Sequence, residues 1–77
     1  MDTTIRFYRK KINMTQQELA DILKLPRTEV SFIETKKILP KYQIIENIAE
    51  ALNVPIGKLY TKEELDFIRY KIGNNHD

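Results

Sequence analysis

The segment PRTEVSFIET, residues 26–35, carries the side chains whose chemistry most needs an explanation. At about 100° per residue, a helix here would place Val30 and Ile33 on an apolar side. The polar side and its start carry Arg27, Thr28, Glu29, Ser31, Phe32 and Thr35. Hydroxyl, guanidinium and carboxylate groups exchange hydrogen bonds with a ligand, whereas a phenyl ring can offer only apolar contact. An outward ring on such a side therefore needs a partner surface, or a cover from its own chain.

Catalytic and metal-binding chemistry is not indicated. The chain has no cysteine, so disulfides, thiol chemistry and cysteine metal sites are excluded. The single histidine, His76, lies in the polar tail GNNHD. The sequence contains no Ser/His/Asp set, no metal-ligand cluster and no glycine-rich phosphate loop. We expect a protein that is not an enzyme and that has no cofactor, no metal and no evident small-molecule ligand.

The charge is small overall but unevenly distributed. The 77 residues carry a net charge of +2. Residues 1–41 contain nine Lys or Arg against five acids, which gives +4, and residues 42–77 contain four against six, which gives −2. A basic half suggests an anionic partner, although ordinary solvated charges give the same count. Because no signal peptide and no apolar run near 18 residues is present, we expect a soluble cytoplasmic protein without a membrane partner.

The elements that must position these side chains are all helical. The apolar spacing predicts six short segments, at 4–12, 15–23, 26–35, 41–52, 55–60 and 61–72, and no strand alternation. Capping boxes are expected to open the second segment at Thr15-Gln-Gln-Glu18 and the last one at Thr61-Lys-Glu-Glu64. Pro26 suits a first helical position. Asn53 and Gly73 suit helix ends.

Apolar faces follow from the same spacing. Ile5, Tyr8 and Ile12 are expected to form the apolar face of the first helix. In the second helix the expected apolar face consists of Leu19, Ala20, Ile22 and Leu23.

Segments 15–23 and 26–35 form a close pair. They are joined by about three residues, which is the layout of a helix-turn-helix, whose second helix enters the DNA major groove. Ala20 is small where the two helices must pass closely. Leu25, Val30 and Ile33 supply the inward face of the second helix.

Over residues 5–60 the sequence resembles the lambda-repressor/Cro-like (XRE-type) helix-turn-helix family, as found in small phage repressors and restriction–modification controller proteins. The matching hallmarks are Arg9, Thr15-Gln16, Glu18-Leu19-Ala20, Ser31, Ile33-Glu34, Lys37, Pro40, Ile48-Ala49 and Leu52. The sequence departs from the family at three places. Lys24 replaces the usual glycine of the turn, Pro26 replaces the usual polar cap, and Thr35-Lys36 displaces a common glycine.

The resemblance implies an all-α fold, a compact five-helix lambda-repressor-like DNA-binding domain over residues 1–60 with an additional C-terminal helix and polar tail at 61–77. It also implies binding of double-stranded DNA. Arg27 could then pair with guanine, while Thr28 and Ser31 reach a base edge or a phosphate. Glu29 could accept from cytosine or repel the backbone. Phe32 could pack on a thymine methyl, the alternative being burial under loop 36–40.

Other residues would place the protein on DNA without reading sequence. The phosphate candidates are Thr15, Gln16, Thr35, Lys36, Lys37 and Lys41, and the alternative is that they are merely solvated. The helix start at Thr15 and Gln16 favours an anion because free N–H groups and the helix dipole meet there. The family resemblance also implies a structural, partly buried ion pair between Arg9 and Glu34 that fixes the docking angle, the alternative being two exposed charges that contribute little.

The last helix suggests a second copy of the chain. Leu65, Ile68 and Ile72 form a stripe, and Phe67 and Tyr70 add aromatic area beside it. We expect Leu65, Phe67, Ile68 and Ile72 to form a homodimer interface, the alternative being packing within the monomer. The function predicted is therefore a dimeric transcriptional repressor on a palindromic operator. The alternative is an antitoxin or other interaction module that binds a partner protein through this helix.

Overall fold

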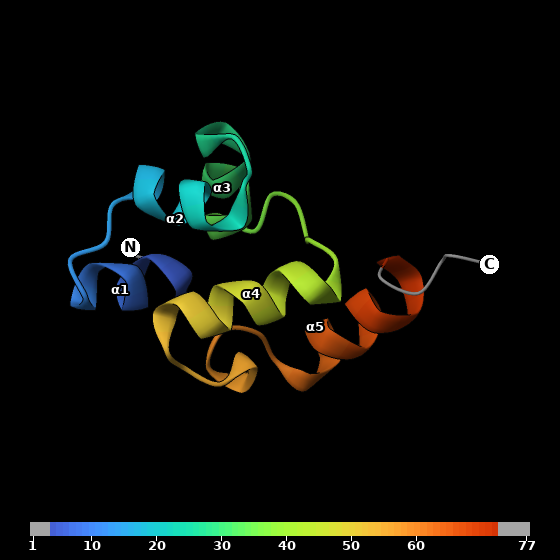
Figure 1. The fold of residues 1–77 in the computed structure, drawn as a ribbon. Helices are drawn as coiled ribbons and strands as arrows, with labels where there is room; N and C mark the ends of the chain where they lie inside the picture. Colours follow the sequence, from blue (N-terminus) through green and yellow to red (C-terminus); the bar gives the residue numbers. More distant parts are fainter. Residues whose placement is uncertain (1–3, 73–77) are drawn as a thin grey trace. The chain divides into compact units, whose positions relative to one another are not determined.

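The computed structural model describes residues 4–72, with the side chain of Ile72 left aside, and every regular element in that range is helical (Figure 1). His76 and Gly73, for which we made predictions, lie outside the described residues. The chain divides into two packing units, Met1–Ile38 and Leu39–Asp77. The functional boundary expected at residue 60 stays a prediction.

The first unit contains three helices and the second contains the remainder. The first has α1 (Thr4–Lys11), α2 (Gln16–Leu23) and α3 (Arg27–Glu34). The second has α4 (Tyr42–Leu52), η1 (Ile56–Lys58), α5 (Lys62–Phe67) and η2 (Ile68–Ile72), the last a π-helical segment that directly follows α5. The all-α prediction is confirmed. No helix within residues 4–72 has both the length and the apolar character needed to cross a bilayer.

Both predicted capping boxes are confirmed. The Thr15 hydroxyl accepts the Glu18 N–H at 3.0 Å, and Glu18 Oε1 accepts the Thr15 N–H at 2.8 Å. The same exchange joins Thr61 and Glu64 at 3.1 and 2.8 Å. Pro26 differs from its prediction, because its extended backbone (ψ 146°) makes it the cap before α3, and Arg27 is the first helical residue.

The four longer helices end alike. Each is followed by one residue with a positive φ, namely Asn13 (57°), Lys24 (60°), Lys36 (61°) and Asn53 (60°). Lys24 thus takes the left-handed conformation that glycine usually supplies in this turn. Asn53 ends α4 as predicted.

The core of the first unit is formed by its apolar helix faces. Its buried apolar residues are Ile5, Leu19, Ala20, Leu23, Val30 and Ile33. The prediction that Ile12 and Ile22 belong to these apolar faces is wrong, since Ile12 is 48% and Ile22 is 52% exposed. Ile12 leaves the helical register because α1 ends at Lys11. Ile22 points roughly 100° away from the middle of the buried α2 stripe, as helical periodicity requires.

The core of the second unit includes part of the last helix. Its buried residues are Ile45, Ile48, Ala49, Leu52, Leu59, Tyr60 and Ile68. The prediction that Ile68 belongs to a dimer interface is therefore wrong, because η2 packs against α4 and leaves Ile68 no exposed surface. Leu65 is half-buried, whereas Phe67 is 49% exposed.

Candidate functional site

The candidate site is the outward side of α3, and a buried polar cluster in the same unit fixes α3 in place. Arg9 Nε donates to Glu34 Oε2 at 2.6 Å, and a terminal Arg9 nitrogen donates to Glu34 Oε1 at 3.2 Å. The other terminal nitrogen donates to the Met14 carbonyl at 2.8 Å. The side chains of Arg9 and Glu34 are only 8% and 2% exposed, so the ion pair ties α1 to the end of α3 away from solvent.

Gln16 joins this cluster, which the sequence alone did not indicate. Its side-chain Nε2 donates to Glu34 Oε1 at 2.9 Å. The predicted anion-binding position at the start of α2 is thereby connected to the ion pair that ends α3. The sequence shows only that a glutamine stands at the first position of the helix. Nothing in that pattern identifies its partner, which lies 18 residues away in the chain.

The helix pair itself is held by small and branched apolar residues. Ala20 is fully buried in α2, and Val30 and Ile33 on α3 are 1% and 2% exposed. Burial of Val30 and Ile33 turns the opposite side of the eight-residue α3 outward. This agrees with the polar and apolar sides expected from the spacing.

The base-reading candidates occupy that outward side. Arg27, Thr28 and Phe32 are exposed, and Glu29 and Ser31 are half-exposed. Phe32 has 47% of its surface exposed, so the alternative that loop 36–40 buries it is wrong. The outward side of α3 therefore presents a guanidinium, hydroxyls and a phenyl ring, which are groups that can bind a ligand.

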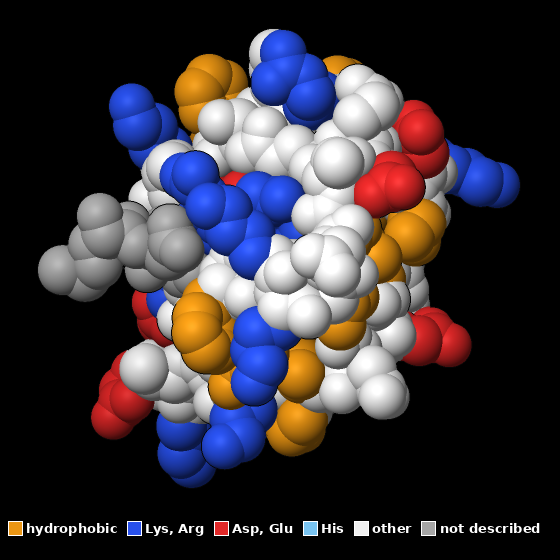
Figure 2. Space-filling view, turned by 90° about the vertical axis from the view of Figure 1, so that its left-hand side faces the viewer, with side chains coloured by type: hydrophobic (Ala, Val, Ile, Leu, Met, Phe, Trp, Pro, Cys, Tyr) orange, Lys and Arg blue, Asp and Glu red, His pale blue; other side chains and the backbone are white. Residues whose placement is uncertain are grey.

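Two of the phosphate candidates use their hydroxyls within the protein. The Thr15 hydroxyl caps α2, and the Thr35 hydroxyl donates to the carbonyls of Ser31 and Phe32 at 3.1 and 3.2 Å. Lys36 and Lys37 are exposed directly after α3. Lys41 is exposed in the second unit, just before α4. In the view of Figure 2, Lys and Arg side chains cover more of the surface than Asp and Glu side chains.

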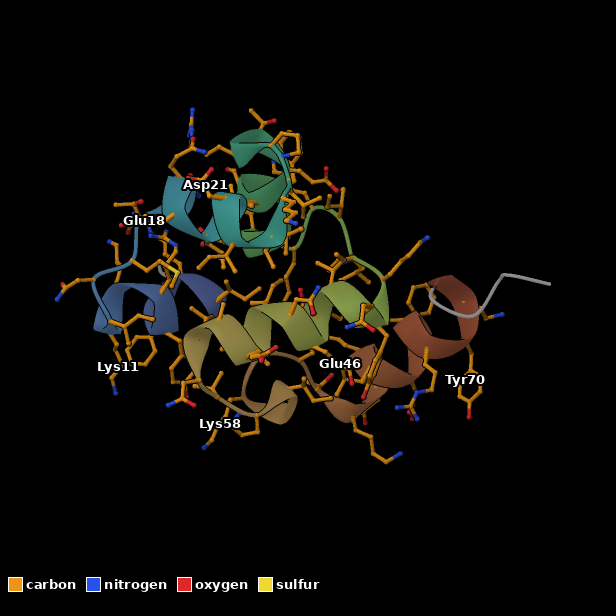
Figure 3. The ribbon with its side chains drawn as sticks, viewed as in Figure 1. Lys11, Glu18, Asp21, Glu46, Lys58 and Tyr70 are labelled. Carbon is orange, nitrogen blue, oxygen red and sulfur yellow. The ribbon has the colours of Figure 1, made fainter. Side chains whose placement is uncertain are left out.

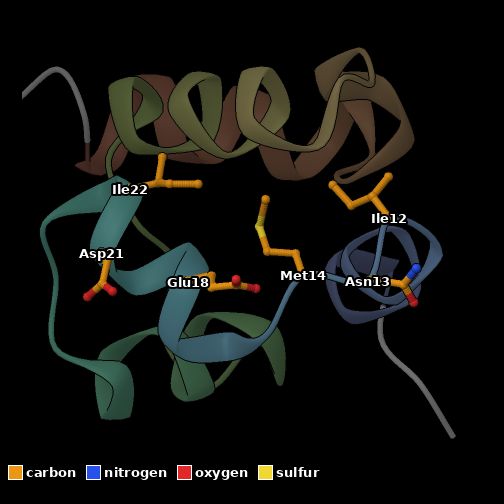
Figure 4. A pocket seen from close by; sticks show the side chains of 6 residues that line it. All are labelled: Ile12, Asn13, Met14, Glu18, Asp21 and Ile22. Atoms are coloured by element: carbon orange, nitrogen blue, oxygen red, sulfur yellow. The ribbon is translucent and has the colours of Figure 1, made fainter.

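A separate pocket of about 430 Å³ opens in the first unit (Figure 4). Its lining consists of Ile12, Asn13, Met14, Glu18, Asp21 and Ile22. None of the residues predicted to contact DNA lines it. Within residues 4–72, no group of His, Asp and Glu side chains is arranged to hold a metal ion.

Comparison with known proteins shows which family and which proteins this chain is similar to. A family model described as Helix-turn-helix matches residues 5–59. An uncharacterized HTH-type transcriptional regulator of Archaeoglobus fulgidus is 34% identical over 64 residues, covering 83% of this chain and 90% of that protein. A second such regulator of the same organism is 37% identical over 60 residues, covering 78% and 86%. The control protein C.SmaI of Serratia marcescens is 34% identical over 61 residues, covering 79% and 73%.

Proposed function

The chain belongs to the XRE-type helix-turn-helix family of DNA-binding transcriptional regulators, and from that premise we propose that it is a homodimeric repressor that reads a palindromic operator through α3. The observation that carries this proposal is the division of α3 into two sides. One side is buried and joined to α1 through the Arg9–Glu34 pair, whereas the other exposes hydrogen-bonding and apolar groups to solvent.

Base reading is assigned to the outward side of α3. Arg27 is the first residue of the helix, and its fork of donors matches guanine O6 and N7. Thr28 and Ser31 supply hydroxyls to base edges or phosphates, and Glu29 supplies an acceptor for a cytosine amino group. The exposed Phe32 ring packs on a thymine methyl.

Backbone placement is assigned to the start of α2 and to lysines that follow α3 in the sequence. Exposed Lys36, Lys37 and Lys41 neutralise phosphates, and the first turn of α2 offers backbone N–H groups near Gln16. The Thr15 hydroxyl accepts a bond inside the protein and keeps its own O–H to donate to a phosphate. The Thr35 hydroxyl already donates to backbone carbonyls, so it would have to give up those bonds to donate to DNA.

The dimer is assigned to the exposed aromatic side chains of the last helix. Phe67 is 49% and Tyr70 is 67% exposed, and Tyr70 points away from the ribbon (Figure 3). One copy of α3 reads few base pairs, and a second copy doubles the contacts at half-sites about one helical turn apart. Repression then follows from occupation of a promoter by the dimer.

Selection of bound sites from random duplex DNA tests the proposal. The expected result is a palindromic motif whose half-sites lie about one helical turn apart, centre to centre. Recovery of random sequences only, at an affinity that does not differ between sites, would contradict sequence-specific regulation. A single half-site motif would retain the DNA reading by α3 and overturn the symmetric dimer.

The exposure of Phe67 and Tyr70 also favours a second candidate function, an antitoxin or interaction module that holds a different protein. Purification of the chain from its natural host distinguishes the two. A stoichiometric second protein, lost when Phe67 is replaced by serine, supports the second candidate. A chain that purifies alone as a dimer supports the first.

A further inference from the structure

The ends of α1, α2, α3 and α4 share one backbone arrangement. In each, the N–H that follows the left-handed residue donates to a carbonyl five residues earlier. The four bonds run from Met14 to Arg9 (3.0 Å), Leu25 to Ala20 (3.0 Å), Lys37 to Phe32 (2.9 Å) and Val54 to Ala49 (3.0 Å). This is the Schellman ending, in which one residue must adopt a positive φ. Each of the four helix endings therefore needs one residue with a positive φ.

The residue with the positive φ differs between helices. The endings of α1 and α4 use Asn13 and Asn53, and asparagine is the residue after glycine that best tolerates the left-handed region. The endings of α2 and α3, the two helices of the pair, use Lys24 and Lys36. Lysine lacks the short polar side chain through which asparagine favours this conformation, so backbone preference does not explain its presence there. Residues kept in unfavourable backbone conformations are concentrated at functional positions.

We propose that Lys24 and Lys36 are kept at these two endings for their charge, and that Lys24 is a further residue that holds the DNA backbone. This inference rests on the proposed function and extends it to a residue outside the predicted contact set. Both lysines are exposed, and they bracket α3 at its two ends.

The position of the two lysines agrees with this role. The major groove is about 12 Å wide and admits an α-helix, and phosphates border the groove on both sides. With α3 lying in the groove, a lysine just beyond either end of the helix is within reach of the phosphate backbone. The left-handed residue turns the chain at that point, so the backbone of each lysine is fixed at a corner of the helix pair while its flexible side chain reaches outward.

The experiment replaces each lysine by the residue that the chain itself uses at the other two endings. Binding of the full chain to random-sequence duplex DNA is titrated at several salt concentrations for wild type, Lys24→Asn and Lys36→Asn. Loss of one phosphate contact should lower the salt slope by about 0.9 and the affinity about eightfold at 0.1 M salt. The melting temperature should not fall, because asparagine accepts the left-handed backbone more readily than lysine.

Two further variants serve as controls. Lys24→Arg keeps the charge and should keep both the affinity and the salt slope. Lys58→Asn removes an exposed lysine from η1, outside the helix pair, and should change the slope much less. The inference would be overturned, with the proposed function left standing, if Lys24→Asn kept the wild-type salt slope and affinity. The same conclusion would follow if Lys58→Asn lost as much slope and affinity as Lys24→Asn. A wild-type chain that binds no duplex DNA would overturn the proposed function together with the inference.

Discussion

Glu34 accepts hydrogen bonds from both Arg9 and Gln16, at 2.6 Å through Oε2 and at 2.9 Å through Oε1. The carboxylate thus connects the last turn of α3 to α1 and to the first residue of α2. Glu34 is 2% exposed, so its carboxylate is shielded from water. The orientation of the outward side of α3 therefore depends on a buried charge that touches no DNA in the proposed complex.

Removing that carboxylate should strongly destabilise the fold. Glu34→Ala leaves the Arg9 guanidinium buried without its partner, and the expected loss is about 3–5 kcal/mol in the free energy of unfolding. Urea denaturation measures it. The double variant Arg9→Met/Glu34→Leu should lose much less, since no charge remains buried. Asp66→Ala, which breaks the exposed Lys62–Asp66 pair, is the control and should hardly alter stability. A similar effect for Asp66→Ala and Glu34→Ala would refute the structural role.

Alkaline pH should weaken the second unit through Tyr60. Burial, and secondarily the charge of Glu64, raises the pKa of Tyr60 from 10.0 to about 12. The folded state therefore holds the phenol proton more tightly than the unfolded state. The resulting stability is complete below pH 10 and is lost as the pH rises toward about 12, by roughly 3 kcal/mol at most. Denaturation at pH 9 to 12 should show this slope, and Tyr60→Phe should remove part of it. Identical slopes in both proteins would contradict the prediction.

The dimer should depend on Phe67 and Tyr70. Phe67→Ser/Tyr70→Ser removes apolar surface that is exposed in the single chain, so the variant should sediment as a monomer and its melting temperature should no longer depend on protein concentration. Phe7→Ser, which changes an equally exposed ring on α1, is the matched control and should leave the dimer intact. A wild-type chain that sediments as a monomer at tens of micromolar would count against the homodimer.

Phe32 should matter for binding and hardly at all for folding. If its ring packs on a thymine methyl, Phe32→Ala and replacement of that thymine by uracil should weaken operator binding to a similar extent. The two losses should not add, because each deletes the same contact. A large drop in melting temperature with unchanged discrimination between thymine and uracil would instead place the ring in the core.

Sequence reasoning was most reliable where the cause of a structure is local. The capping boxes at Thr15 and Thr61 follow from residues three positions apart, and the left-handed Asn53 follows from its own side chain. Family resemblance added the Arg9–Glu34 pair, which no local rule indicates. The outward position of Phe32 followed from the 3.6-residue period alone.

Errors arose where tertiary contacts decide which flank of a helix is covered. Ile22 and Ile68 both fit apolar stripes, yet Ile22 is exposed and Ile68 is fully buried. The spacing defines the angle of a stripe but not its edges, since these depend on the neighbouring helix. The bond from Gln16 to Glu34 was missed for the same reason, because long polar side chains find partners that only the folded backbone brings within reach.

The central claim is that α3 reads bases in the major groove, and a double-mutant cycle on Arg27 tests it most directly. Operator affinity is measured for wild type and Arg27→Ala, each with the natural site and with one half-site guanine replaced by 7-deazaguanine, which lacks the N7 acceptor. We predict that Arg27→Ala costs about 1–3 kcal/mol and that one guanine position in each half-site shows a loss that is not additive with it. Full additivity at every guanine of the operator would contradict major-groove reading by Arg27.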